Sequence, residues 1–297
     1  MEEQFMHKQP MDIASRDALM ELMRNRHSCR QYLPDDVDEE TLQSILTVGL
    51  QAPSGCNFQP YSVIVVRKAE TKNIISEICG QSFIKSAPVN LVFLLDWHKL
   101  SLYASHQQAP FLSNESLDDN LTGYADVVCA MSHIEIAALF YGLGCCFIGN
   151  CLGHSAPLKK ALDLKEKTYP VLILTLGYPA VGTSLIPKLP YSCMVFEESY
   201  NSVSDETILD DFHKKYGHLS FELSKDPKHR EHQLNQINQA LQTTYSPEEA
   251  ADILSDIQAT NRLNEMQRRF TLQNCAYESY AHSEEVRFDM ASLGIML

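Results

Sequence analysis

The sequence is short of positive charge. Lys and Arg together number 24 against 38 Asp and Glu, which gives a formal net charge of −14 at pH 7. Nucleic acids and anionic membrane surfaces are polyanions that bind basic protein surfaces, so this balance argues against both as partners. Any anionic ligand must instead meet a local cluster of Arg and Lys side chains.

Several common motifs are also absent. No GxGxxG stretch follows a strand-like run, which argues against a Rossmann dinucleotide domain. No GxSxG elbow is present to anchor a hydrolase triad, and no CxxC pair indicates thiol redox chemistry. The chain starts without an apolar segment behind a basic end, and no apolar run approaches the ~18 residues of a membrane span. We therefore expect a soluble, cytoplasmic protein.

The nine cysteines do not form a disulfide framework. Their number is odd, they are scattered, and Cys145 and Cys146 are adjacent, which favours reduced thiols in the cytosol. Cys151 and His154 lie nearby and add two more zinc-type donors. The spacing of these four residues matches no known zinc site, so we expect no bound metal.

Three short apolar runs predict β-strands. Residues 61–66, 89–96 and 170–177 are rich in β-branched residues and almost continuously apolar, which is typical of central strands covered on both faces. Between them, apolar residues at helical spacing over 124–141 predict a long helix, buried in the core or at a subunit interface. An amphipathic helix is predicted over 38–51, with Asp38 capping its start.

The character of the chain changes after about residue 204. The remainder is polar, Gln-rich and compatible with helices, and Ser246 followed by Pro247 predicts a helix start. We therefore expect two domains, 1–204 and a helical C-terminal extension, 205–297. The extension is too polar for a sizeable core of its own, so its apolar stripe should pack on the first domain or on a second chain, beside the substrate cleft. A loose arm that recruits a separate partner is the alternative. The stripe comprises Ile253, Leu254, Ile257, Leu263 and Met266.

One candidate binding motif is Arg26-His27-Ser28-Cys29-Arg30. It places a hydroxyl between two guanidinium groups, and a terminal phosphate binds such forked, charge-assisted donors well. An exposed basic turn is the other interpretation of this motif taken alone.

A second motif runs from Ala52 to Tyr61 and is bracketed by two prolines. It contains the Ser54 hydroxyl and the side-chain amides of Asn57 and Gln59. Amides offer donors and acceptors together, as the edge of a flavin ring requires. A purely structural loop is the alternative, because Asn and Gly favour turns.

These motifs, with the glycine-containing turn 142–149, the LGYP stretch 176–179 and the PKLP stretch 187–190, resemble signatures of the nitroreductase superfamily. They occur in the order of that family, and the similarity covers roughly residues 15 to 200. The larger oxygen-insensitive nitroreductase and flavin reductase subgroup is the most similar. The last ~80 residues do not match the compact ending expected of the family.

The resemblance implies an α+β fold, with a mixed, mainly antiparallel sheet flanked by helices. It also implies an intertwined homodimer with two FMN sites at the subunit interface. The first motif would contact the phosphate and ribityl chain, the second would surround the flavin, and Lys188 would close on the phosphate. Lys in place of the more usual Arg keeps the positive charge but loses the two parallel donors of a guanidinium group. The implied FMN-binding residues are Arg26, His27, Ser28, Arg30, Ser54, Asn57, Gln59, Gln81, Ile148, Gly149 and Lys188.

The function implied by the resemblance is electron transfer from NAD(P)H through FMN to a small-molecule acceptor. In the expected ping-pong sequence the reduced nicotinamide delivers a hydride and leaves, and a nitroaromatic, quinone or flavin then takes two electrons. The cofactor carries this chemistry, so no catalytic acid or base is predicted. A flavin-dependent dehalogenase or dehydrogenase is a rival within the fold. A flavin-binding sensor or scaffold, whose extension recruits a protein partner, is the rival from another class.

Overall fold

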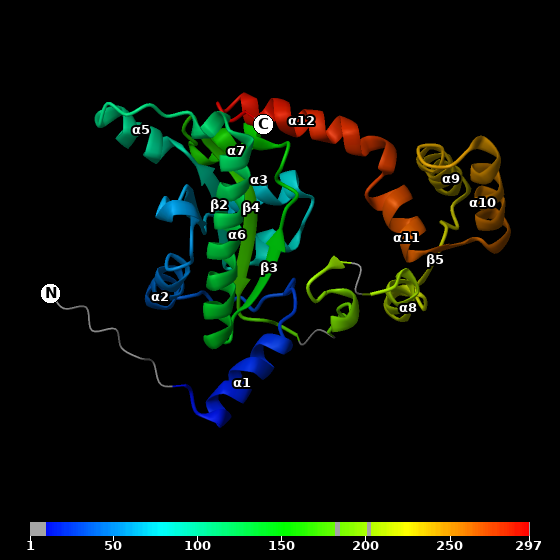
Figure 1. Cartoon of the computed structure of the whole chain (residues 1–297), viewed down its shortest axis with the longest axis horizontal. Helices are drawn as coiled ribbons and strands as arrows, with labels where there is room; N and C mark the ends of the chain where they lie inside the picture. Colours follow the sequence, from blue (N-terminus) through cyan, green and yellow to red (C-terminus); the bar gives the residue numbers. More distant parts are fainter. Residues whose placement is uncertain (1–9, 182–184, 201–202, 297) are drawn as a thin grey trace. The chain divides into compact units, whose positions relative to one another are not determined.

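The computed structural model describes residues 10–181, 185–200 and 203–296 (Figure 1). The chain divides into two compact units, one formed by Met1–Leu185 with Val286–Leu297 and the other by Ile186–Glu285. This division differs from the expected 1–204 and 205–297 in two respects. It falls before residue 204, and the end of the chain returns to the first unit.

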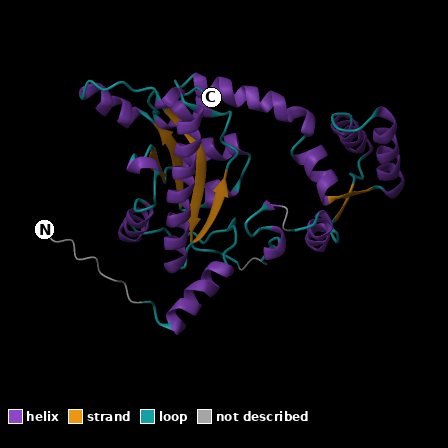
Figure 2. Cartoon of the chain, in the orientation of Figure 1, coloured by secondary structure: helices purple, strands orange, loops and turns teal. Residues whose placement is uncertain are grey.

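The first unit contains a four-stranded sheet in which every neighbouring pair is antiparallel (Figure 2). The order is β1-β2-β4-β3, with bounds β1 Tyr61–Val66, β2 Val89–Asp96, β3 Gly144–Ile148 and β4 Thr168–Gly177. The strands predicted over 61–66, 89–96 and 170–177 are therefore confirmed, as is the mainly antiparallel α+β fold.

Two details of the sheet correct the sequence expectations. The segment expected to be a glycine-containing turn is mostly strand β3, and the left-handed turn before it is confined to Gly142, with φ of +71°. Strand β1 is not central, because it lies at the edge of the sheet and Val65 is 40% exposed. An apolar run alone does not distinguish an edge strand from a central one.

Helices cover both faces of the sheet. On one face α6, Leu117–Phe140, and α2, Glu39–Gly49, share a buried apolar cluster with the strands. On the other face α3, Ala69–Cys79, and α7, Ser155–Leu162, share a second cluster. The predicted cap of α2 is confirmed, because the Asp38 side chain accepts a hydrogen bond from the backbone N–H of Thr41.

Helix α6 is the longest element of the unit and runs along the sheet (Figure 1). Its core-facing side chains include Val127, Met131 and Ile134, which are at most 1% exposed. By length and composition it is apolar enough to cross a membrane, so the expectation that no segment approaches that length is wrong. Half of its most apolar window is buried within the unit, as in the core helix of a globular protein.

The end of the chain belongs to the first unit because it is buried there. Helix α12, Ser279–Ala291, carries Asp289, whose carboxylate accepts hydrogen bonds from the Ser155 hydroxyl at 2.6 Å and the Tyr169 hydroxyl at 3.0 Å. Leu293 and Ile295 follow and are at most 1% exposed in the cluster beneath α6. The remaining helices of this unit are α1 Ile13–Arg24, α4 Phe83–Ser86 and α5 His98–His106.

The second unit is mainly helical and has its own small core. Its elements are α8 Asp205–Tyr216, β5 Ser220–Glu222, α9 Pro227–Leu241, α10 Pro247–Thr260, β6 Arg262–Asn264 and α11 Glu265–Arg268. The helix start at Ser246 is confirmed as a capping box with Glu249. Ile257 and Leu263 are buried in a cluster that Ile253 and Leu254 also join. The stripe expected to pack on another body therefore packs largely within its own unit.

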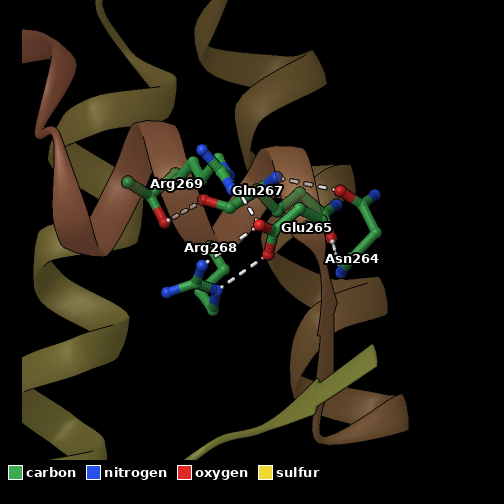
Figure 3. Close-up of polar contacts among 6 residues, drawn as sticks. Asn264, Glu265, Gln267, Arg268 and Arg269 are labelled. Carbon is green, nitrogen blue, oxygen red and sulfur yellow. Dashed lines mark hydrogen bonds and ion pairs between the residues drawn. The ribbon is translucent and has the colours of Figure 1, made fainter. Parts of the chain in front are cut away.

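Polar contacts reinforce this small core. Glu265, only 3% exposed, accepts hydrogen bonds from Arg268 and Arg269, and Asn264 and Gln267 form a second capping box (Figure 3). The paired guanidinium groups hold the pKa of Glu265 below its usual value, with the hydrogen bond from Arg268 as the main cause. The carboxylate is therefore charged and partnered at neutral pH.

Candidate functional site

A pocket of about 160 Å³ lies in the first unit at the β3 edge of the sheet. Its walls are formed by Arg30, Gln81, Phe83, Cys146, Phe147, Ile148, Gly149 and Asn150. Four residues predicted from the sequence, Arg30, Gln81, Ile148 and Gly149, thus meet in one place. Enclosed ligand sites usually measure about 300 to 1,000 Å³, so this pocket alone is smaller than a typical site for a whole cofactor.

The segment that carries Arg30 is fixed against strand β3. The backbone N–H of Cys29 donates to the carbonyl of Cys145 at 2.8 Å, and Ser28 forms a parallel bridge with the same residue. This close approach depends on Gly144, because a Cβ there would lie 2.7 Å from the Cβ of Cys29. Gly144, interpreted from the sequence as part of a turn, therefore allows the segment that carries Arg30 to pack against β3.

The charge of Arg30 is not neutralised within the described part of the chain. Its side chain is exposed, it has no carboxylate partner among these residues, and its guanidinium carbon lies 6.0 Å from the Phe83 ring centroid. Burial raises the pKa of the neighbouring Cys146 thiol, and Arg30 only partly opposes that shift. The pocket thus presents one cation among neutral walls, which suits an anionic group.

The other predicted residues of the pocket are placed by the ends of α3 and β3. Gly80 ends α3 in the left-handed conformation, and the Ser76 hydroxyl then donates to the carbonyl of Gln81 at 2.9 Å. The Gln81 side chain lines the pocket as a consequence. Ile148 is the last residue of β3, and Gly149 follows it directly.

The first half of the Arg-rich motif is used differently. Arg26 donates from Nη1 to the Glu135 carboxylate at 2.8 Å, and His27 Nδ1 lies 3.1 Å from the Asn25 carbonyl oxygen. Neither residue lines the pocket, and nor does Ser28. Arg26 therefore anchors its segment to α6 in this chain, and any direct contact with phosphate stays a prediction.

The loop that carries Ser54, Asn57 and Gln59 lies at the opposite edge of the sheet, where it leads into β1. Three strand spacings separate β1 from β3, or about 14 Å. A single chain therefore does not bring this loop to the pocket. Within the loop the Gln59 backbone N–H donates to Ser54 Oγ at 3.3 Å, and the Gln59 side chain donates to the Leu50 carbonyl at 3.1 Å.

Lys188 belongs to the second unit, where its side chain is exposed. Its expected contact with a phosphate stays a prediction. Among the described residues no group of three His, Cys, Asp or Glu side chains is arranged to hold a metal. Cys145, Cys146 and Cys151 are free and buried, and burial raises the pKa of Cys151 to about 12.

Several residues of this region were missed from the sequence. Phe83, Cys146, Phe147 and Asn150 line the pocket without belonging to a predicted contact set. Two acids on α6, Asp126 and Glu135, touch the two predicted binding segments. The sequence does mark Asp126 and Glu135, because an acid within an apolar helix is rarely buried without a partner.

Comparison with known proteins identifies the family. The sequence model described as "Nitroreductase family" matches residues 23–178, just over half of the chain. An NADPH-dependent oxidoreductase of Staphylococcus haemolyticus is 30% identical over 196 residues, covering 64% of this chain and 77% of the relative. An FMN reductase [NAD(P)H] of Bacillus subtilis is 33% identical over 181 residues, covering 60% and 72%.

Solved structures extend the likeness beyond that region. A Bacteroides fragilis protein superposes with a TM-score of 0.71 at 24% identity, over 94% of this chain and all of its own. The Vibrio harveyi NADPH:FMN oxidoreductase gives a TM-score of 0.61 at 26% identity, over 67% and 83%. The first of these covers the second unit as well, and at 24% identity it shows a shared fold. The chain belongs to the nitroreductase family.

Proposed function

We propose that this chain is an FMN-dependent oxidoreductase that takes electrons from NAD(P)H. The observation that carries the proposal is the pocket itself, where an unneutralised Arg30 meets Gln81, Ile148 and Gly149 within the family-matched region. The names of the relatives, an NADPH-dependent oxidoreductase and an FMN reductase, support the same donor and cofactor.

The pocket residues fit such a cofactor. The exposed guanidinium of Arg30 suits the terminal phosphate, and the Gln81 amide offers both a donor and an acceptor to a ring edge. Phe147 and Ile148 supply apolar wall that excludes water. Bound FMN supplies the hydride-accepting ring, while the protein residues bind and orient it.

We propose that a second copy of the chain completes the site. The pocket of one chain is small, and loop 54–59, expected at the flavin, lies at the far edge of its sheet. Helix α6 also exposes an unpartnered apolar stripe at helical spacing, which water would not favour. In the proposed homodimer the partner covers this stripe and its own loop 54–59 reaches the pocket. The stripe residues are Leu117, Leu121, Tyr124 and Val128.

The proposed acceptors are nitroaromatics, quinones or free flavin, which would occupy the cleft after the nicotinamide leaves, in a ping-pong sequence. The net charge of −14 favours small molecules over nucleic acids or anionic membranes as partners. We place the enzyme in the cytoplasm, in keeping with nine scattered cysteines that do not form a disulfide framework.

Three measurements test this function. Purified protein should take up one FMN per chain by absorbance titration, and should then oxidise NADH or NADPH faster when nitrofurazone or menadione is added. Light scattering should report a mass twice that of the 33.6 kDa chain. Protein that binds no added FMN contradicts the proposal. Protein that binds FMN but oxidises neither nicotinamide supports the sensor or scaffold instead.

A further inference from the structure

Two buried acids interrupt the apolar face of α6. Asp126 is 5% exposed and Glu135 is 7% exposed. A buried carboxylate is costly unless hydrogen bonds or an opposite charge compensate for the lost water. In this chain each of the two acids has found its partner in one of the segments expected at the flavin.

Asp126 holds the loop that contains Ser54 and Asn57. Both of its carboxylate oxygens accept the backbone N–H of Gly55, at 3.0 and 3.2 Å. The loop lies so close to the helix here that a Cβ at Gly55 would come within 2.7 Å of the Thr122 methyl carbon. Burial raises the pKa of Asp126, and the hydrogen bond from Gly55 opposes that shift.

The loop needs such a support because its backbone is strained. Cys56, Asn57 and Gln59 have φ values of +51°, +57° and +49°. These values lie in the left-handed region of backbone conformation, which residues other than glycine rarely adopt. Each such residue costs on the order of 1 kcal/mol or more, and persists only where surrounding contacts fix it. Strain of this kind clusters where side chains are preset for a ligand.

Glu135 holds the other segment. Its carboxylate accepts Arg26 Nη1 at 2.8 Å, and Arg26 lies four residues before the pocket residue Arg30. The segment is then fixed a second time by the backbone contact of Cys29 with β3. Arg30 is thus presented from a backbone secured on both an adjacent helix and an adjacent strand.

The spacing of the two acids matches the spacing of the segments. Nine residues of α-helix correspond to about 13.5 Å and two and a half turns, so Asp126 and Glu135 point to opposite sides of α6. They flank its core-facing row of Val127, Met131 and Ile134. One rigid helix therefore reaches toward both edges of the sheet.

We propose that Asp126 and Glu135 are positioning residues, through which α6 presets the two half-sites of the flavin without either acid touching FMN. This inference rests on the proposed function. Asp126 sets the loop whose amides face the ring in the partner's site, and Glu135 sets the phosphate-binding segment of its own chain. For FMN affinity, keeping the acceptor oxygen of each acid in its place should matter more than keeping its negative charge.

Matched substitutions separate position from charge. Asp126→Asn keeps an acceptor oxygen opposite Gly55 and loses the charge, whereas Asp126→Glu keeps the charge and displaces it by one methylene. We expect D126N to bind FMN within about 3-fold of the original protein and D126E to bind about 10-fold more weakly, the loss of roughly one charged hydrogen bond. At the other acid, Glu135→Gln should likewise bind FMN more tightly than Glu135→Asp. Asp118→Asn, an exposed acid in the first turn of α6, is the control.

The readouts are the FMN dissociation constant by fluorescence quenching, the visible spectrum of the bound flavin, and kcat and KM, all measured well below the melting temperature. A displaced loop should alter the flavin spectrum in D126E, whereas a merely destabilised but folded protein should not. Equal FMN affinity and identical spectra in D126E and E135D would overturn the inference, even if both melt earlier. Weaker binding in D126N than in D126E would also overturn it, because charge would then be the essential property. If the unsubstituted protein binds no FMN, the proposed function fails instead.

Discussion

The two units of this chain are stabilised in different ways. The first buries an antiparallel sheet between two apolar clusters, one on each face. The second has a two-stranded sheet of three-residue strands and one small cluster, supported by capping boxes and the partners of Glu265. Continuous apolar runs make the first kind of core, and sparse helical stripes make the second.

The difference also separates the proposed chemistry from the less familiar part of the chain. The pocket and the family match both lie in the first unit, where packing against the sheet fixes each segment. Lys188 belongs to the second unit, and its contact with a phosphate stays a prediction, while solved structures match this unit in fold. Both units bury carboxylates together with partners: Asp126 and Glu135 lie on α6 in the first unit, and Glu265 accepts hydrogen bonds from two arginines in the second.

The largest expected effect tests the two cores directly. Phe93 in β2 is fully buried, so Phe93→Ala should lower the free energy of unfolding by about 3 to 5 kcal/mol. Leu263 in β6 is 2% exposed in the smaller cluster, which can relax more easily, so Leu263→Ala should cost about 2 kcal/mol. Urea denaturation followed by circular dichroism measures both. Equal losses would mean that the second unit is packed as tightly as the first.

The next effect concerns the pocket. Arg30→Ala should weaken FMN binding by about 1.5 to 3 kcal/mol, or roughly 10- to 150-fold, because a charged hydrogen bond to phosphate is lost. Arg24→Ala removes an exposed guanidinium from α1 and serves as the control. Fluorescence quenching of FMN gives both dissociation constants. Unchanged affinity in R30A would remove this residue from the site.

A smaller effect tests the polar support of the second unit. The pKa of Glu265 is lowered in the folded protein, so its contribution to stability is present above the unfolded pKa and is lost as pH falls through the folded one. Glu265→Gln should therefore lower the stability at pH 7 by about 1 to 2 kcal/mol. The gap should close as the solution is acidified below about pH 4, near the unfolded pKa of a glutamate. Thermal melts of both proteins across this pH range measure the difference in stability. A difference that does not change with pH would contradict the ion-pair role of Glu265.

The smallest effect asks whether the second unit takes part in binding. Lys188 is exposed, and a solvated ammonium group contributes less to phosphate binding than the bidentate guanidinium of an Arg. Lys188→Ala should therefore weaken FMN binding by less than about 1 kcal/mol. Lys228→Ala, which removes another exposed Lys from α9, is the control in the same unit. A loss greater than that of R30A would make the second unit a principal part of the site.

Much of this structure could be predicted from the sequence because the deciding signals are local. The apolar runs of β1 and β2 set the strands, and Asp38 and Ser246 set two helix starts through their own backbone contacts. The ordered motifs around Arg30 and Ser54 likewise carried the family resemblance, which the match over residues 23–178 confirms. Each of these features depends on neighbours within a few residues.

Only the tertiary structure decided which distant segments meet. The return of Leu293 and Ile295 to the first core depends on an apolar cluster assembled from distant segments, which no local pattern describes. The sequence likewise shows Asp126 and Glu135 merely as acids in an apolar helix, whereas their partners, Gly55 and Arg26, lie 71 and 109 residues away in the chain. A buried carboxylate must find a partner, but sheet order and helix packing determine which one, and those are set by the burial of the whole core rather than by any one stretch of sequence.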